Sequence, residues 1–160
     1  MKLNLGCGQG TSTDMVNVDI VALPGVDVVA DLDEDWPWKD GSVEYILASH
    51  VFEHIDRPDH FMAEAHRVLE DGGVLDIRVP YWRHSNSFTD PTHKRHCTER
   101  TFDYWIPGTS LHGQLGAALG SPPCVFRPGR MEFGKYEGEV IPNEMRFFMG
   151  KLDGVPDPPA

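Results

Sequence analysis

Five short, apolar-biased runs recur over the first 80 residues of this chain, and turn-forming residues separate them. They cover residues 2–5, 16–20, 26–30, 43–48 and 74–79. Runs of four to six residues with this composition predict β-strands. Strands that alternate with connecting segments predict a parallel sheet with right-handed crossovers, which is an α/β sandwich.

A helix is expected between the fourth and fifth strands. Pro58 suits a first helical turn, and apolar residues then recur at three- and four-residue spacing from Phe61 to Leu69. Residues 71–73, with two glycines, predict a glycine cap at the end of this helix. Only residues 11–15 separate the first glycine loop from the second strand, so we expect the first crossover helix to be truncated.

The second half of the chain changes in character, because residues 81–97 are polar and rich in histidine and aromatic side chains. The patterns that follow predict helices at 98–105 and 111–119, and an antiparallel pair of strands at 125–133 and 144–151.

The length of 160 residues predicts one domain. We place it at residues 1–153, with a first part at 1–80 and a second at 81–153. The Pro-rich tail at 154–160 is expected to be disordered.

Charge separates the two parts of the chain. Residues 1–77 carry 16 Asp and Glu against 4 Lys and Arg, whereas residues 78–160 carry 9 against 10. The net charge of -11 argues against a protein that coats nucleic acid or an anionic membrane. No apolar run approaches the roughly 20 residues of a membrane-spanning helix, and the N-terminus shows no signal-peptide pattern.

The three cysteines are few and widely spaced. Cys7, Cys97 and Cys124 form neither a disulfide framework nor a CxxC zinc motif. They favour a reducing, cytoplasmic setting.

A glycine loop follows the first strand. Gly6, Gly8 and Gly10 would let a ligand approach the backbone closely. A dinucleotide fingerprint fits poorly, because the third glycine comes one position early and Asp19 follows Gly6 by only 13 residues. Asp19 and Asp31 end neighbouring strands, where carboxylates can bind ribose hydroxyls and an adenine amino group, since open parallel sheets bind ligands at this edge. The alternative is that both aspartates are turn residues.

Several segments, taken in order, resemble the motifs of class I S-adenosylmethionine-dependent methyltransferases of the type-11 branch. They are residues 3–8 (LNLGCG) with 17–20 (NVDI), 30–32 (ADL), 36–44 (WPWKDGSVE), 49–55 (SHVFEHI) and 67–73 (RVLEDGG). The resemblance implies a Rossmann-like α/β fold, S-adenosylmethionine as cofactor with S-adenosylhomocysteine as product, and methyl transfer to a small or medium-sized acceptor. No nucleic-acid or membrane partner is implied.

Carried over by position, the resemblance also implies a cofactor site. Its residues would be Gly6, Cys7 and Gly8 at the methionine portion, Asp19 and Ile20 at the ribose and adenine, Asp31 and Leu32 at the adenine, and Ser49 and His50 near the methyl group. The missing first helix is the main departure from the family pattern.

For binding of the methyl acceptor, the sequence offers only individual polar residues as candidates. A base is needed only where the acceptor must lose a proton, and the candidates are His54, His84, Asp90, His93 and His96. Residues 90–95 (DPTHKR) are similar to a stretch found in small type-11-like methyltransferases. For His54 the alternative is a role in capping the helix that Pro58 opens.

Other functions stay open as alternatives. His84, His93, His96 and Cys97 match no common zinc spacing, so no metal is predicted, and Arg57 excludes an HExxH motif. A methyltransferase fold that binds a cofactor or partner without turnover is one rival, and an NAD-type oxidoreductase is another.

Overall fold

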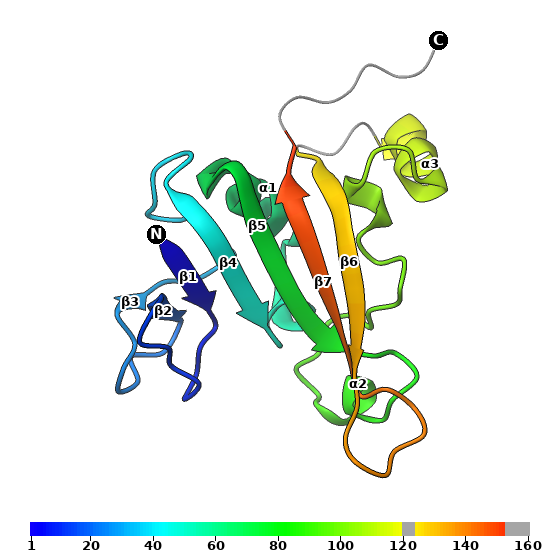
Figure 1. Cartoon of the computed structure of the whole chain (residues 1–160), viewed down its shortest axis with the longest axis horizontal. Coiled ribbons are helices and arrows are strands. Elements are labelled where there is room, and N and C mark those ends of the chain that lie inside the picture. The colour runs from blue at the N-terminus through cyan, green and yellow to red at the C-terminus, as the bar shows by residue number, and fades with distance from the viewer. Residues whose placement is uncertain (120–123, 153–160) are drawn as a thin grey trace.

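The computed structural model describes residues 1–119 and 124–152, and within them seven strands form one sheet in the order β3-β2-β1-β4-β5-β7-β6 (Figure 1). The first five strands are parallel, and β7 runs antiparallel to both β5 and β6. The strands are β1 (Lys2–Leu5), β2 (Val16–Asp19), β3 (Val28–Val29), β4 (Val43–Ser49), β5 (Leu69–Pro80), β6 (Phe126–Gly134) and β7 (Glu144–Lys151).

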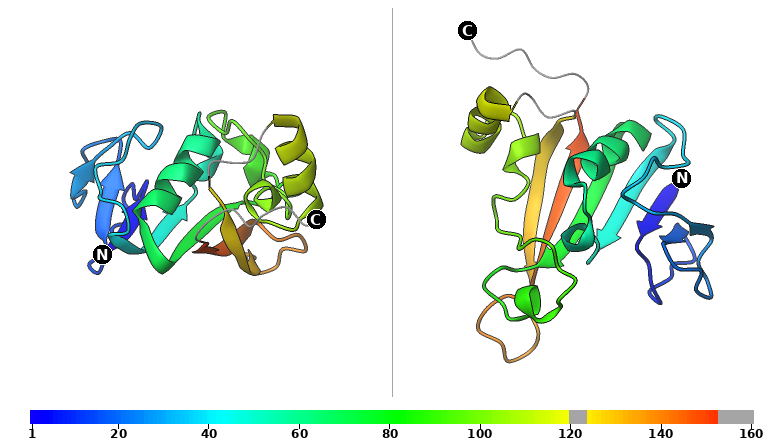
Figure 2. Two further views of the ribbon diagram at one scale, coloured as in Figure 1. Left: turned by 90° about the horizontal axis from the view of Figure 1, so that it is seen from above. Right: turned by 180° about the vertical axis from the view of Figure 1, so that it is seen from behind.

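The helices are few and short. Both α1 (Pro58–Val68) and α3 (Ser110–Leu119) lie on the same side of the sheet (Figure 2). A short α2 (Asn86–Thr89) and two 3-10 turns, η1 (Phe52–His54) and η2 (Asp103–Trp105), complete the described helices. None of these helices has the length and apolarity that crossing a membrane requires.

The predicted α/β class, the parallel first half and the antiparallel C-terminal strands are confirmed. The truncated first crossover is confirmed as well, since no helix is described between β1 and β2. The predicted disordered tail at 154–160 lies outside the described residues.

Two predicted details were wrong. The predicted glycine cap is absent, because α1 ends at Val68 and the chain turns directly into β5. Leu69 is fully buried and pairs with Val43, which draws this residue into the sheet. Gly72, with a φ of 80°, then lies in an irregular stretch of β5 rather than in a helix cap.

The helix predicted at 98–105 is reduced to the turn η2. The Thr101 hydroxyl accepts a hydrogen bond from the Thr98 amide, and the Thr98 hydroxyl accepts one from the Arg100 amide. The backbone amides of Thr101 and Trp105 donate to the carbonyls of Thr98 and Phe102, three residues earlier, which is the hydrogen-bond pattern of turns and 3-10 helix rather than of an α-helix.

An aromatic core fills the space between α1 and the sheet. Phe52 contacts Phe61, Phe102 and Trp105 with ring centroids 5.0 to 6.2 Å apart, and all four side chains are buried. Because each buried aromatic ring removes a large apolar area from water, this cluster stabilises η1 on the sheet and so fixes the start of the segment after β4.

One ion-pair network joins α1 to the segment after β3. Glu64 accepts hydrogen bonds from the Arg67 guanidinium and from the Trp36 amide, and Arg67 also donates to the Trp36 and Trp38 carbonyls. The adjacent guanidinium lowers the pKa of Glu64 from its ordinary value of 4.5.

We expect Glu64→Gln to lower the free energy of unfolding by about 2 kcal/mol at pH 7, because charged hydrogen bonds are lost. The lowered pKa makes this contribution complete above pH 4.5 and removes it as the pH falls further, through the pKa of the folded state. Urea unfolding at pH 7 and pH 3 measures both effects, with exposed Glu70→Gln as control. A loss of equal size at pH 3 would contradict the assignment.

Candidate functional site

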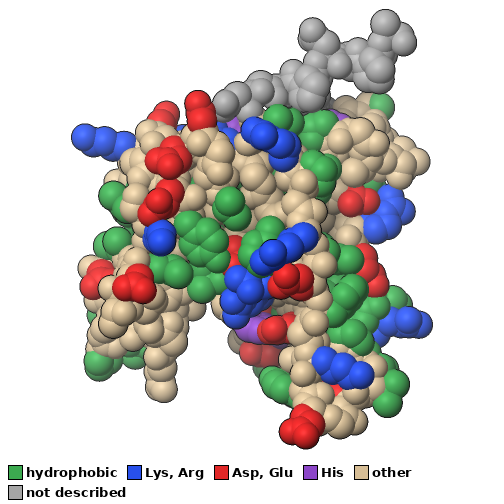
Figure 3. All heavy atoms as spheres, in the orientation of Figure 1, with side chains coloured by type: hydrophobic (Ala, Val, Ile, Leu, Met, Phe, Trp, Pro, Cys, Tyr) green, Lys and Arg blue, Asp and Glu red, His purple; other side chains and the backbone are tan. Residues whose placement is uncertain are grey.

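The carboxyl ends of β1, β2 and β4 meet at one edge of the sheet, where a cavity of about 380 Å³ opens. Its wall includes Gly6 after β1, Asp19 and Ile20 at the end of β2, and His50 after β4. Figure 3 shows a recess at this lower edge, between two projecting parts of the molecule, with acidic and histidine side chains along its wall. Strand direction alone brings these residues together, because parallel strands end at one edge.

Asp19 links the glycine loop to the end of β2. One carboxylate oxygen accepts a hydrogen bond from the Gly8 amide at 2.8 Å, and the other accepts one from the Val21 amide at 3.0 Å. Each carboxylate oxygen has a second lone pair, so Asp19 can still accept hydrogen bonds from a ligand in the cavity.

Gly6 is required by both backbone and space. Its φ is 57°, and a Cβ there would lie 2.3 Å from Val51 Cγ2. The close approach lets the first strand end directly against the segment after β4, so the loop and Val51 together form one wall of the cavity.

We expect Gly6→Ala to lower the free energy of unfolding by several kcal/mol, because a strained φ combines with a steric clash. Gly8→Ala is the matched control, since Gly8 has a φ of 50° but no heavy atom within 4 Å of an added Cβ. Urea unfolding should show the smaller loss for Gly8→Ala, and adding Val51→Ala should restore part of the Gly6→Ala loss. Equal losses in the two single variants would rule out the steric part of this account.

Two buried asparagines hold the loop where the first helix is missing. Asn4 Nδ2 donates to the Gly10 carbonyl and to Asn17 Oδ1, and Asn17 Oδ1 also accepts from the Ser12 amide. The Gly10 carbonyl and the Ser12 amide are therefore paired with asparagine side chains rather than through helical hydrogen bonds.

A second acidic group lines the cavity after β3. Asp31 is exposed and Leu32 is buried, and both contribute to the wall. Asp33, which the sequence analysis did not single out, also lines it and accepts hydrogen bonds from the Asp56 and Arg57 amides at 3.0 and 2.7 Å. Asp33 thereby supports the start of α1.

The predicted cofactor residues do not all reach this cavity. Gly6, Asp19, Ile20, Asp31, Leu32 and His50 line it. Cys7 is buried, and burial together with nearby Asp19 raises the pKa of its thiol. Gly8 contributes its amide to Asp19, and Ser49 is the last residue of β4, paired with Arg78.

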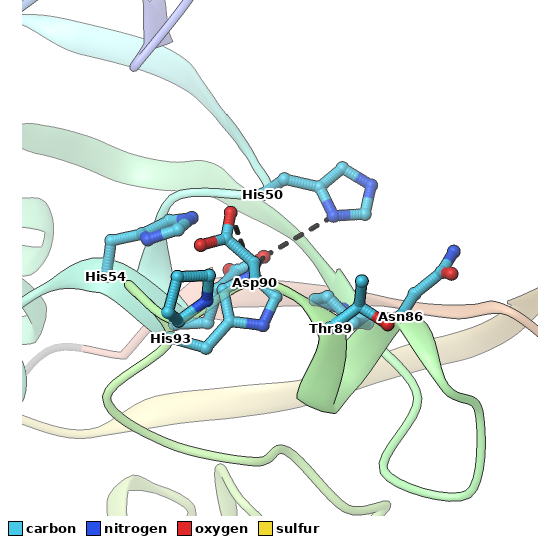
Figure 4. Close-up of a pocket in the computed structure, with 9 residues that line it drawn as sticks. His50, His54, Asn86, Thr89, Asp90 and His93 are labelled. Carbon is cyan, nitrogen blue, oxygen red and sulfur yellow. Dashed lines mark ion pairs between the residues drawn. The ribbon is translucent and has the colours of Figure 1, made fainter.

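A second cavity, of about 580 Å³, adjoins the first, and His50 and His54 line both. The segment after β5 supplies its other side, including Asp90 and His93 (Figure 4). In Figure 4, Asn86 and Thr89 of α2 lie apart from the group formed by His54, Asp90 and His93. The two cavities thus share one wall of histidines.

Glu53 is the most unusual group at this shared wall. Its side chain is 1% exposed, and neither carboxylate oxygen has a hydrogen-bond partner within residues 1–119 and 124–152. His50 Nδ1 lies 3.4 Å from Glu53 Oε1, and this carboxylate raises the pKa of His50. His50 also has a φ of 56°, an uncommon backbone conformation that directs it away from the line of β4.

Three of the predicted acceptor-side residues come together and two do not. His54, Asp90 and His93 line the second cavity. His54 does not cap α1, because its Nδ1 faces Thr92 while Asp33 takes the free amides before the helix. His84 pairs with Glu139 at 3.0 Å, and His96 stacks on Phe88, so neither lines either cavity.

The sequence did not predict a role for Glu53, although this residue lies within the motif at residues 49–55. The sequence signal was its place between His50 and His54, but an acidic residue is ordinarily exposed, so burial decided its importance. Cys97, one of the metal candidates considered, is buried with its thiol pKa raised to about 12 by desolvation, and does not line either cavity.

Comparison with known proteins agrees with this geometry. Residues 3–77 match the family model described as a methyltransferase domain, of the type-11 family. A curated relative, an uncharacterized 37.1 kDa protein in transposon TN4556 of Streptomyces fradiae, is 30% identical over 103 aligned residues. That match covers 50% of this chain and 30% of the relative, so the chain spans less than a third of the relative's length.

Solved structures share the fold at low sequence identity. An S-adenosylmethionine-dependent methyltransferase from Archaeoglobus fulgidus is 18% identical with a TM-score of 0.67, over 94% of this chain and 85% of that one. A Burkholderia thailandensis N-methyltransferase solved with 1,6-didemethyltoxoflavin and S-adenosylhomocysteine is also 18% identical, with a TM-score of 0.62 over 95% and 71%.

Proposed function

We propose that this chain binds S-adenosylmethionine and transfers its methyl group to a small or medium-sized acceptor. The proposal is supported by the match of residues 3–77 to the methyltransferase-domain model and by a fold shared with solved S-adenosylmethionine-dependent methyltransferases. The observation that carries the proposal is the pair of adjoining cavities, one lined by the glycine loop and carboxylates and the other by histidines. The bound cofactor would supply a methyl group already activated by a positive sulfonium.

The first cavity fits that ligand by its chemistry. Asp19 and Asp31 offer acceptors to ribose hydroxyls and an adenine amino group, while Ile20 and Leu32 offer apolar contact. The carboxylates of Asp33 and Asp56 add negative charge that favours a cationic ligand, although Lys94 pairs with Asp56 at 2.6 Å. The glycine loop admits the ligand close to the backbone.

The second cavity suits the acceptor. In the transfer, the bond from sulfur to the methyl carbon breaks, the bond to the acceptor atom forms, and any acceptor proton passes to a base. His54, Asp90 and His93 face this space and would bind the acceptor atom or remove that proton. Hydrogen bonds from Thr92 lower the pKa of Asp90, so Asp90 would stay ionised and bind a cationic or donor group.

The buried thiols support a reducing setting, which we propose is cytoplasmic. Cys7, Cys97 and Cys124 are buried and unpaired, and burial raises the pKa of Cys97 and Cys124 to about 12. We propose a small molecule rather than a nucleic acid as the acceptor, because the cofactor half is strongly acidic.

Calorimetry with S-adenosylhomocysteine tests the first half of the proposal, and micromolar binding is expected. Release of S-adenosylhomocysteine from S-adenosylmethionine, followed against a panel of hydroxyl, amine and carboxylate metabolites, tests the second half. Binding without turnover of any acceptor would favour a non-catalytic module. A thermal shift with NAD but none with S-adenosylhomocysteine would overturn the proposal in favour of an oxidoreductase.

A further inference from the structure

The wall shared by the two cavities holds the buried carboxylate of Glu53, which accepts no hydrogen bond from any described residue, and histidines lie beside it. Glu53, His54 and His93 each offer one potential ligand atom, and these three atoms all lie within 4.8 Å of one another. Glu53 is 1% exposed and the His93 side chain 8% exposed. An ionised carboxylate in such a place is costly unless a positive charge compensates it.

Hydrogen bonds prepare both histidines to bind a cation. His93 Nδ1 lies 3.0 Å from the Ser87 carbonyl oxygen, and His54 Nδ1 lies 3.3 Å from the Thr92 carbonyl oxygen. The Thr92 hydroxyl oxygen also lies 3.0 Å from His54 Nδ1, but this hydroxyl donates its own proton to Asp90 Oδ1. Because a carbonyl oxygen only accepts, and the hydroxyl proton is already engaged, each Nδ1 donates its proton and leaves the Nε2 lone pair free. Metal-binding histidines ordinarily have this second hydrogen bond, which fixes the tautomer and ring orientation.

From this cluster we propose that Glu53, His54 and His93 bind a divalent transition-metal ion such as Zn²⁺. Two imidazoles and one carboxylate form a common ligand set for zinc and iron, whereas Mg²⁺ and Ca²⁺ prefer oxygen ligands alone. Ligand atoms around one zinc ion lie about 3.4 Å apart, so the three side chains must approach each other by up to about 1.4 Å.

Asp90 is positioned to complete the site. Its Oδ2 lies 4.0 Å from His93 Nε2, while its Oδ1 is held by the Thr92 amide and hydroxyl. The cluster lines the second cavity. A metal ion held by three side chains there, with Asp90 nearby, would therefore keep a coordination position open for an oxygen atom of a bound small molecule.

The metal site deepens the proposed function, and its role toward the methyl acceptor rests on that function. A cation at this point would bind an acceptor that carries a hydroxyl, and would lower the pKa of that hydroxyl without a strong base. The acceptor class is therefore a small molecule with an ionisable oxygen placed to bind the metal.

The competing account is that histidine protons compensate Glu53. His50 Nδ1 lies 3.4 Å from Glu53 Oε1 and His93 Nε2 lies 4.0 Å from it, so two imidazolium ions could supply the charge instead. The two accounts differ in whether His93 Nε2 carries a proton at neutral pH. A metal ion can bind Nε2 only when that proton is absent.

The test is zinc titration of chelator-treated protein without a histidine tag, by competition with a chromophoric chelator. We expect one equivalent to bind, and both Glu53→Gln and His93→Gln to weaken binding by at least about 100-fold, because each removes a ligand. His96→Gln and His84→Gln are matched controls that should bind zinc as the wild type does. Circular dichroism shows whether each variant is folded, and His54→Gln provides a third ligand test at a less buried position.

Cobalt substitution gives a readout independent of activity. Co²⁺ in the wild-type site should show visible ligand-field absorption without the thiolate charge-transfer band, since the three cysteines lie outside the cluster. S-adenosylhomocysteine binding to metal-free protein should persist, so failure of the metal site would leave the proposed function standing. Unchanged zinc affinity in both Glu53→Gln and His93→Gln, or a His93 imidazolium seen by NMR at pH 7 with zinc present, would overturn the inference.

Discussion

Asp19→Ala is expected to weaken S-adenosylhomocysteine binding by at least about 100-fold, which corresponds to about 2.7 kcal/mol. The carboxylate lies on the wall of the first cavity and is oriented by the Gly8 and Val21 amides. Removing it deletes the acceptor proposed for the ribose hydroxyls and also frees the glycine loop. Both losses act on the same ligand, so the effect should exceed that of a single hydrogen bond.

Isothermal titration calorimetry measures this prediction. Asp14→Ala, at an exposed position in the same part of the chain, is the control and should bind normally. Asp19→Asn keeps one acceptor oxygen and should bind with intermediate affinity. Wild-type affinity in Asp19→Ala would show that the cofactor site lies elsewhere, whereas loss of binding in Asp14→Ala as well would point to a general effect of lost charge.

The largest effect on stability is expected from Asp76→Ala, with a loss of about 3–5 kcal/mol. Asp76 is fully buried in β5 and accepts hydrogen bonds from Arg146 of β7 and from the Tyr45 hydroxyl of β4. The hydrogen bonds to Asp76 raise the pKa of Arg146, and burial, followed by Asp76, raises the pKa of Tyr45. Without Asp76, a partly buried guanidinium keeps its charge but loses its partner.

Urea unfolding of Asp76→Ala, Arg146→Ala and the double variant measures the coupling between the two residues. The double variant should lose less than the two single losses combined, because it leaves no unpaired charge. Asp71→Ala, exposed on the same strand, is the control and should change little. Additive losses would mean that Asp76 and Arg146 stabilise the sheet independently.

The strands illustrate what local sequence can predict. The apolar runs located β1 and β4 closely, and the bounds of β7 were predicted at 144–151 as observed. A strand can be recognised from sequence because its residues are either all apolar or alternate between apolar and polar. Both patterns involve only neighbouring residues. The glycines at 72 and 73 were misread, because the pairing of Leu69 with Val43, which ended α1 early, is a contact between distant segments.

The first cavity shows the same contrast between what the sequence predicts and what only the structure reveals. Strand-end residues such as Gly6, Asp19 and Asp31 were predicted to lie together, since parallel strands place their carboxyl ends at one edge. The sequence did not single out Asp33, which supports the start of α1 by accepting hydrogen bonds from the Asp56 and Arg57 amides. That contact depends on how the connection after β3 crosses the sheet.

The sequence by itself determined the parallel sheet, the glycine loop and the acidic strand ends, because periodicity and strand order are carried by neighbouring residues. Only the tertiary structure decided that Glu53 is buried without a hydrogen bond from any residue the structure describes, and that His93 lies beside it, 40 positions along the chain. Whether a residue is buried depends on which segments, distant from it in the sequence, pack over it. For that reason the histidine wall between the two cavities appeared only once the segments after β4 and β5 were placed against each other.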